Sequence, residues 1–323
     1  MPGLQRESLD GLIVLDKPAG WTSHDAVARV RRLTGERRVG HAGTLDPLAT
    51  GVLVLGIGQG TRLLEYVAMA GKSYRATIRL GISTDTYDSD GQITSTLPFE
   101  SITETGLAAT LRQFQGAIEQ RPPIYSALKR NGRPLYSYAR MGIAIEVQPR
   151  LVQIDALRLS RFEPPELELI IECGSGFYVR SLAHDLGQTL GCGAHLIGLV
   201  RTRVGRFVLQ EAVDLDTVAE ISSAGRVDLL LHALDAPLVD QPAVILSAAH
   251  VADIVNGKML HLQPARSHAV EQFCRAYSVA GEFIAVLVAT AQGTFQPHKV
   301  FPAGHRGSTN GPEIPPIVLS PQK

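Results

Sequence analysis

Cysteine, excess charge and long apolar segments are all scarce in this sequence of 323 residues. The three cysteines are odd in number and far apart, which argues against a disulfide framework. The longest apolar runs, Gly51–Gly58 and Phe283–Ala289, are far shorter than the ~20 residues that a membrane-spanning helix needs. Met1–Asp10 is polar, and the apolar run Leu12–Leu15 is shorter than the hydrophobic segment of a signal peptide. We therefore expect a soluble, cytoplasmic protein that does not bind membranes.

Charge is balanced overall but segregated along the chain. Lysine and arginine total 31, as do aspartate and glutamate, so the formal net charge is zero. Three segments are nonetheless basic: Arg29–Arg38, Arg121–Arg140 and Arg201–Arg206. In the second, tyrosines are interleaved with lysine and arginine, and no acid is present. Because cations contact phosphates and aromatic rings stack on bases, the sequence favours a nucleic acid as partner.

Helix-like and strand-like segments are interspersed irregularly, which is typical of the α+β class rather than of a regular parallel βαβ array. The expected helices run from Thr22 or Ser23 to Thr34, from Thr61 to Ala70, over Thr103–Gln115 and from Tyr178 to Leu190. The expected strands are Leu12–Leu15, Val52–Leu55, Lys72–Leu80, Ile143–Phe162, Glu166–Cys173 and Phe283–Ala289, with an interrupted loop at Val39–Gly51.

A shift of composition around Asp235–Pro242 predicts two domains. The first covers residues 1–240, and its basic, proline- and tyrosine-containing stretch at 121–142 is expected to be an RNA-clamping insertion. The second, at 241–303, is a stretch of short strands with one helix. The last residues, 304–323, are rich in Gly, Pro and Ser and are expected to form a flexible tail.

No cofactor or metal motif has the required spacing. Gly56, Gly58 and Gly60 lie between a strand and a helix, but Thr61 takes the place of the third glycine of a dinucleotide fingerprint. His184, Cys192 and His195 are close in sequence without a metal-ligand pattern. We therefore expect no metal, no nucleotide cofactor and no other cofactor.

One segment does contain a candidate catalytic residue. In the run Gly40–Gly51 a carboxylate, Asp46, stands in a glycine-bounded loop directly before Pro47, which stiffens the backbone. Together with Leu15–Pro18, this run resembles the TruB family of tRNA pseudouridine synthases. The resemblance continues, in the family's order, at Lys72–Arg75, Asp85–Gly91, Gly174–Arg180 and Gly191–Leu196.

The resemblance implies a fold and an activity. The fold would be that of pseudouridine synthases, a mixed and mostly antiparallel sheet flanked by helices, followed by a small PUA-like, β-rich RNA-binding domain. The activity would be isomerisation of the uridine at position 55, in the T-loop of tRNA, to pseudouridine, with the base flipped out of the RNA. That reaction needs no redox agent, metal or ATP, in agreement with the missing motifs. The expected partner is the T-stem-loop of tRNA, bound by a monomer.

The resemblance also assigns residues. Asp46 would be the catalytic carboxylate, Arg180 its ion-pair partner, and Tyr74 a catalytic residue that packs on the base. His41, Tyr178 and Leu199 would bind substrate together with Tyr74. Contacts to RNA are expected from Lys17, Lys129, Arg130 and Arg133, with a structural role as the alternative for Lys17. The sequence leaves open whether Asp46 adds to uracil C6, attacks C1′ or initiates a glycal route.

Three other functions remain to be distinguished. A non-catalytic RNA-binding protein would have no use for the combination of Asp46, Tyr74 and Arg180. A glycosidase would need a second carboxylate facing the same bond, and no recognisable motif supplies one. A guide-RNA-dependent relative of the family would be expected to carry a long basic tail, which is absent from this sequence.

Overall fold

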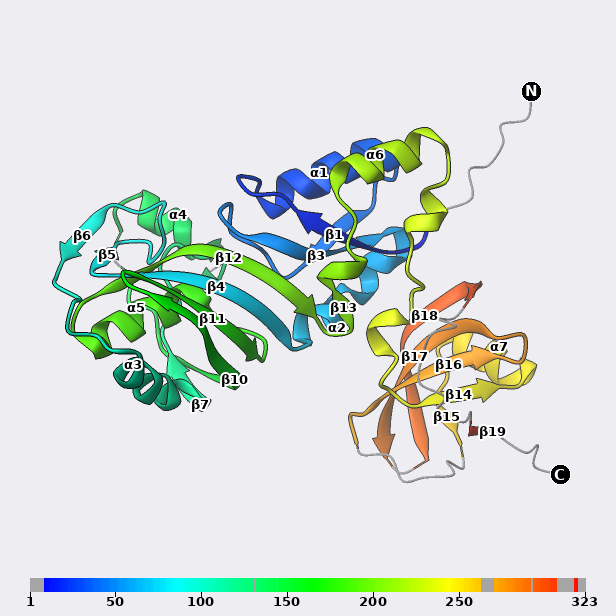
Figure 1. Cartoon of the computed structure of the whole chain (residues 1–323). Helices are drawn as coiled ribbons and strands as arrows, with labels where there is room; N and C mark the ends of the chain where they lie inside the picture. The colour runs from blue at the N-terminus through cyan, green and yellow to red at the C-terminus, as the bar shows by residue number, and fades with distance from the viewer. Residues whose placement is uncertain are drawn as a thin grey trace.

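The computed structural model describes residues 9–130, 132–143, 145–262, 270–291, 293–306 and 317–318. Within them, strands form one sheet of nine strands, one of six and two short hairpins. Figure 1 shows the nine-stranded sheet extending across the molecule, with the six-stranded sheet beside one end of it. The chain is therefore α+β, as the sequence predicts.

The large sheet has the order β1-β3-β12-β4-β11-β10-β7, with β2 added to β3 and β13 to β12. Its neighbours pair antiparallel except for β3 and β12, which are parallel. This confirms a mixed, mostly antiparallel sheet. The strands are β1 (Gly11–Lys17), β2 (Val39–Ala42), β3 (Thr50–Ile57), β4 (Lys72–Leu80), β7 (Gly116–Gln120), β10 (Arg150–Glu163), β11 (Glu166–Cys173), β12 (Ala194–Val204) and β13 (Phe207–Val208).

Helix α1 (Ser23–Thr34) shows how local sequence sets an element. Thr22 and Asp25 form a reciprocal capping box at its start, and Gly35 ends it in the left-handed conformation with φ 69°. Its apolar side buries Ala26, Val27 and Val30 in the main core. The other helices of this part are α2 (Leu64–Met69), α3 (Glu104–Leu111), α4 (Leu135–Arg140), α5 (Val179–Leu190) and α6 (Leu215–Ser223).

Short elements complete the first part of the chain. The two hairpins are β5 (Ile82–Thr84) with β6 (Ile93–Thr96), and β8 (Lys129–Arg130) with β9 (Arg133–Pro134). The 3₁₀ turns are η1 (Gly58–Leu63), η2 (Arg112–Phe114), η3 (Leu209–Glu211), η4 (Val227–Leu230) and η5 (Ala236–Leu238).

Three expected boundaries are corrected. The loop predicted at Val39–Gly51 contains β2 and the start of β3, because Val39–Ala42 pairs along its length with β3. Thr61 does not cap a helix, since it lies inside η1, whose N-cap is Ile57. The strand predicted from Ile143 begins only at Arg150.

The six-stranded sheet begins at Ala243 and has the order β15-β18-β17-β16-β14-β19. Its core consists mainly of aliphatic residues and is separate from that of the large sheet. The elements are β14 (Ala243–Leu246), α7 (Ala248–Val255), β15 (Leu260–His261), β16 (Phe273–Ser278), β17 (Glu282–Ala291), β18 (Thr294–Arg306) and β19 (Ile317–Val318). The predicted tail at 304–323 is thus wrong where β18 and β19 form, and its other residues lie outside the described ones.

A shared apolar cluster joins the two sheets. Leu63, Tyr66, Leu234 and Leu238 from the first part pack with Phe283, Val286 and Phe301 from the second. Around it, the Arg62 guanidinium lies 4.7 Å from the centre of the Phe301 ring, and Lys299 Nζ lies 2.8 Å from a Glu65 carboxylate oxygen. The junction is therefore packed rather than a bare linker.

Candidate active site

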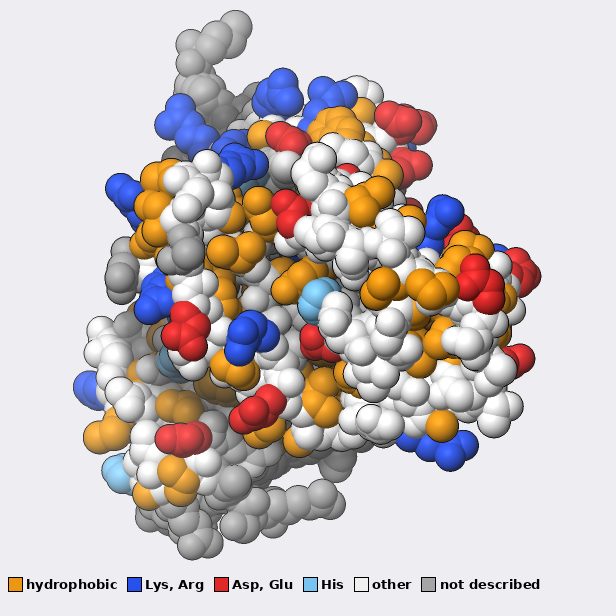
Figure 2. All heavy atoms as spheres, turned by 90° about the vertical axis from the view of Figure 1, so that its left-hand side faces the viewer, with side chains coloured by type: hydrophobic (Ala, Val, Ile, Leu, Met, Phe, Trp, Pro, Cys, Tyr) orange, Lys and Arg blue, Asp and Glu red, His pale blue; other side chains and the backbone are white. Residues whose placement is uncertain are grey.

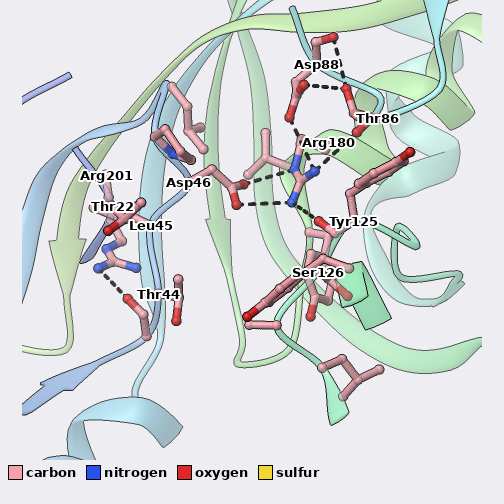
Figure 3. Close-up of a pocket in the computed structure, with 18 of the residues that line it drawn as sticks. Thr22, Thr44, Leu45, Asp46, Thr86, Asp88, Tyr125, Ser126, Arg180 and Arg201 are labelled. Carbon is pink, nitrogen blue, oxygen red and sulfur yellow. Dashed lines mark hydrogen bonds and ion pairs between the residues drawn. The ribbon is translucent and has the colours of Figure 1, made fainter. Parts of the chain in front are cut away.

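A cavity of about 760 Å³ opens where the loop after β2, strands β4 and β12, the start of α5 and the segment 125–140 meet. Figure 3 shows the side chains that converge there. The lining residues include Asp46, Tyr74, Asp88, Tyr125, Tyr136, Arg140, Tyr178, Arg180, Leu199 and Arg201.

Asp46 and Arg180 meet in this cavity although 134 positions separate them. Arg180 Nη2 donates to Asp46 Oδ1 at 3.1 Å, and Arg180 Nε lies 2.9 Å from Asp46 Oδ2. This two-point geometry fixes the orientation of the carboxylate. The Arg180 side chain is only 6% exposed, whereas the Asp46 side chain keeps 34% of its surface exposed. Asp46 is thus held from one side and open to the cavity on another.

The loop that carries Asp46 is pinned from α1. The Ser23 hydroxyl donates to the carbonyl of Leu45 at 3.1 Å and accepts from the Leu45 backbone N–H at 2.8 Å. A turn follows directly, because the Ala49 N–H donates to the Asp46 carbonyl at 3.0 Å. The residue before Asp46 and the backbone after it are therefore both fixed. Ser23 was expected only as a possible helix cap, and its hydroxyl has this additional role.

Arg180 is shared with a second carboxylate that sequence reasoning missed. Its Nη1 lies 3.3 Å from Asp88 Oδ2, and the Asp88 side chain is 5% exposed. The guanidinium also donates to the backbone carbonyls of Thr86 at 3.2 Å and Tyr125 at 2.9 Å. Asp88 lies within the family motif Asp85–Gly91, so the sequence did mark this segment as important. Nothing in the local sequence indicated that Asp88 would pair with Arg180.

Burial raises the pKa of the Asp46 carboxyl, and the nearby negative charge of Asp88 adds to that rise, while the Arg180 guanidinium opposes it. Arg180 therefore limits the upward shift rather than producing a net downward one. A carboxylate with a raised pKa is a better base and nucleophile than a freely solvated one.

Tyr74, on β4, is nearly fully buried and lines the same cavity. Burial raises the pKa of its phenol, and the charge of Arg201 opposes the rise. The hydroxyl is therefore protonated at neutral pH and available as a hydrogen-bond donor. Tyr178 lies just before α5 and Leu199 lies on β12, and both line the cavity, Leu199 with 7% exposure. These predicted residues are brought together.

His41 does not line the cavity. It lies on β2, and its ring packs edge-on against His24, with the centroids 5.3 Å apart. His24, which the sequence did not single out, is the histidine on the cavity wall. Burial lowers the pKa of His41 to about 4, and the charges of His24 and Arg201 contribute, so His41 is neutral at physiological pH.

The expected contact of Lys17 with RNA is corrected. Its side chain is completely buried. Its ammonium group donates to the carbonyls of Pro18 at 2.8 Å and Trp21 at 2.6 Å, which ties the end of β1 to the turn before α1. Lys17 has no exposed surface and, unlike Lys72 and Arg201, does not line the cavity, so its role is structural.

Lys129, Arg130 and Arg133 lie in the β8–β9 hairpin and are exposed. The hairpin leads into α4, and this segment supplies Tyr125, Ser126, Tyr136 and Arg140 to the cavity wall. Arg130 Nη1 also donates to the Glu146 carbonyl at 2.6 Å. The predicted insertion thus forms one side of the cavity. Of its cations, Arg140 lines the cavity, whereas Lys129, Arg130 and Arg133 do not.

Among the described residues, no group of three or more His, Cys, Asp and Glu side chains is placed to hold a metal ion. Within the same residues, no helix combines the length and apolar character needed to cross a membrane.

In fold, the chain is similar to solved structures of complexes that contain Cbf5. It matches the crystal structure of a Cbf5-Nop10-Gar1 complex with a TM-score of 0.69 at 23% identity, over 90% of this chain and 84% of that one. It matches the archaeal box H/ACA sRNP Nop10-Cbf5 complex with a TM-score of 0.66 at 21% identity, over 90% and 85% of the two chains. At this identity the likeness shows the fold: a pseudouridine synthase fold with a small β-rich domain.

Sequence comparison is more specific. Residues 31–179 match the TruB family pseudouridylate synthase N-terminal domain, and residues 180–238 match the tRNA pseudouridylate synthase B C-terminal domain. A tRNA pseudouridine synthase B of Dehalococcoides mccartyi is 41% identical over 91% of this chain and 97% of its own length. A protein of the same name from Opitutus terrae is 47% identical over 66% of this chain and 88% of its own. The chain belongs to the TruB family of pseudouridylate synthases and is an isomerase.

Proposed function

We propose that this enzyme converts the uridine at position 55 of tRNA to pseudouridine, with the base flipped out of the T-loop into the cavity and Asp46 as the reacting carboxylate. The single observation that carries the proposal is the half-open ion pair: Arg180 holds Asp46 at two points while part of the carboxylate faces the cavity. The names of the relatives support tRNA as the substrate.

The chemistry fits a site that supplies acid–base groups alone. In the isomerisation the N1–C1′ bond of uridine breaks and a C5–C1′ bond forms. The proton on C5 is lost and N1 gains a proton, so no atom or electron is added overall. In this proposal Asp46 reacts with the uridine, and Tyr74 and Leu199, which line the same cavity, pack on the base.

A uridine stacked in a folded loop cannot reach a carboxylate at the bottom of a cavity. Eversion of the base costs a few kcal/mol, which stacking and hydrogen bonding in the cavity offset. The aromatic residues Tyr125, Tyr136 and Tyr178 on its wall suit such stacking.

Basic surface around the cavity supports RNA as the partner. Figure 2 shows lysine and arginine side chains mainly along the upper and left parts of one face, with aspartate and glutamate more frequent at its right. Exposed cations of the β8–β9 hairpin and of α1 belong to the segments Arg121–Arg140 and Arg29–Arg38 identified in the sequence. We propose that the hairpin and α4 clamp the RNA loop. Action as a cytoplasmic monomer remains a prediction.

The second carboxylate does not favour a glycosidase. Asp88 faces the same guanidinium as Asp46 and is 5% exposed, so the two carboxylates do not flank a space for a glycosidic bond. Its position instead supports a role in holding Arg180.

The test is an assay with an unmodified tRNA transcript labelled with tritium at uracil C5. The enzyme is expected to release tritium and to leave pseudouridine at position 55. Asp46→Asn should bind the transcript within a few-fold of the wild type and release no tritium, because an amide cannot act as a nucleophile or base. Wild-type enzyme that releases no label, or an Asp46→Asn variant that remains active, would contradict the proposal.

A further inference from the structure

Three buried cations lie together beneath the catalytic loop. Lys17 on β1, Lys72 on β4 and Arg201 on β12 are 0%, 8% and 1% exposed. Their charges act on one another: burial lowers the pKa of both lysines to about 8, and the charge of Arg201 contributes to both shifts. Like charges are thus concentrated in a region that water screens poorly.

These cations have no paired carboxylate within the described part of the chain. Their nitrogens donate to backbone carbonyls instead. Lys72 Nζ donates to Ala68 and Ala70, both at 2.8 Å, and Arg201 donates to Val52 at 2.7 Å and to Gly43 at 2.9 Å. Asp46 is the acid whose charge acts on Arg201, but it is already engaged by Arg180. Carbonyl oxygens satisfy hydrogen bonds and leave the net positive charge in place.

Two of the three cations, Lys72 and Arg201, line the cavity, together with Gly43, Thr44 and Ala68. Figure 3 shows Arg201 and Arg180 on opposite sides of Asp46. Gly43 keeps this end open, because a Cβ there would lie 3.3 Å from Arg201 Nη1 and 3.6 Å from Lys72 Cε. Its φ of +71° also favours glycine. The cavity therefore has a second, cationic end, at which Lys72 and Arg201 form no ion pair among the described residues.

We propose that the Lys72–Arg201 end of the cavity is a subsite for a backbone phosphate of the RNA, adjacent to the flipped uridine. This inference rests on the proposed function. A nucleotide that leaves the stack carries its flanking phosphates with it, and a phosphodiester supplies the anion that this end lacks. Cations near a phosphate form charge-assisted hydrogen bonds, which are stronger than those between neutral groups. The subsite would position the sugar whose C1′ must face Asp46.

The test neutralises the phosphate rather than the protein. RNA hairpins with the T-loop sequence are prepared with a single methylphosphonate at the linkage 5′ or 3′ of the target uridine, or at a linkage in the stem. The wild type is expected to lose binding about tenfold for one of the two flanking linkages and little for the stem linkage. The same hairpins are then bound to Lys72→Met and to the control Arg75→Met, which removes an exposed cation from the same strand.

The two variants distinguish a phosphate subsite at Lys72 from a general effect of removing a positive charge. Lys72→Met should bind the unmodified hairpin about tenfold more weakly and be insensitive to the methylphosphonate, whereas Arg75→Met should keep the wild-type sensitivity. Equal sensitivity in Lys72→Met and the wild type would overturn the subsite, as would a wild type insensitive at both flanking linkages. Pseudouridine formation on the unmodified hairpin is measured in parallel. Its absence would refute the proposed function, whereas its presence without phosphate sensitivity would refute only the subsite.

Discussion

Two buried arginine–aspartate pairs, one in the cavity and one at the junction between the sheets, show how the surroundings decide what an ion pair does. Arg275 Nη1 lies 3.6 Å from Asp235 Oδ2, with side-chain exposures of 7% and 0%. Tyr277 donates to the same Asp235 oxygen, and Arg275 also donates to the carbonyls of Gln241 and Val239. Both members of this pair are enclosed by protein.

In the cavity the guanidinium is equally buried, but one carboxylate is open, since Asp46 keeps 34% exposure. A sealed pair fixes two parts of the chain relative to each other. A pair with one open member presents an oriented charge to whatever enters the cavity. The same two residue types thus form a sealed pair in one region and a partly exposed pair in the other, and we propose reactivity only for the second.

The largest expected effect comes from removing the guanidinium of the open pair. Arg180→Met should lower kcat by ~10³-fold, because Asp46 loses its orientation and faces Asp88 without a counter-ion. Since Arg180 opposes the rise in the pKa of Asp46, its loss raises that pKa further. Activity that needs ionised Asp46 should then fall off at higher pH than in the wild type. Single-turnover rates between pH 5 and 9 measure both effects, with Arg180→Lys as the charge-retaining control. An unshifted acidic limb would show that Arg180 does not control the charge of Asp46.

Breaking the sealed pair should affect stability instead. Asp235→Asn leaves Arg275 buried without its carboxylate and should lower the free energy of unfolding by about 3 kcal/mol. Urea denaturation measures this loss, and the kcat of the folded variant should stay within twofold of the wild type. Tyr277→Phe, which removes the hydroxyl that donates to Asp235 and accepts from Arg275, should cost about 2 kcal/mol. A large fall in kcat for Asp235→Asn would remove the distinction between the two pairs.

Cations outside these two pairs differ between two regions of the molecule. In the six-stranded domain, the described lysines pair with acids: Lys258 with Asp253 and Lys299 with Glu65. In the β8–β9 hairpin, Lys129, Arg130 and Arg133 form no ion pair among the described residues.

Neutralising the three hairpin cations to Gln should therefore weaken tRNA binding about tenfold at moderate salt. It should also make the slope of log K against log salt shallower by about 2, since fewer counter-ions are released. Lys258→Gln is the control, and it should leave both quantities unchanged. A triple variant with wild-type affinity and salt slope would refute the clamp.

The smallest effect concerns a carboxylate that has no guanidinium partner. Asp185 on α5 forms no ion pair among the described residues, and burial raises its pKa to about 6 while Arg121 opposes the shift. Because the folded state binds this proton more tightly than the unfolded state, ionisation of Asp185 costs stability as pH rises from about 4 to 6. Asp185→Asn should stabilise the protein by about 1 kcal/mol at pH 8 and hardly at pH 4. Urea denaturation at the two pH values measures this. An equal change in stability at pH 4 and pH 8 would contradict a raised pKa for Asp185.

Local rules predicted the elements whose signals lie within a few residues. Strand β4 has the predicted bounds Lys72–Leu80, and α1 has the predicted cap and end. Strand β2 escaped prediction because Val39–Ala42 contains a glycine and is stabilised by pairing with β3 rather than by its own pattern.

The candidate site likewise has residues that the sequence predicted and contacts that it could not. The family motifs indicated Asp46 and Arg180, but the sharing of Arg180 with Asp88 depends on how a loop and a helix are folded together. The burial of Lys17 was equally hidden, because a lysine at the end of a strand has no local feature that distinguishes it from an exposed one.

The parallel contact between β3 and β12 involves only Thr50 with Val200 and Gly51 with Arg201. This short contact joins the part of the sheet that carries the Asp46 loop to the part on which α5 packs. Asp46 and Arg180 thus come from the two different parts of the sheet. The Arg201 side chain, from β12, links these parts by donating to the Val52 carbonyl of β3. A shift of β3 relative to β12 would change the distance between Asp46 and Arg180 while each part of the sheet kept its own packing. The geometry of this ion pair therefore depends on the alignment of the two parts.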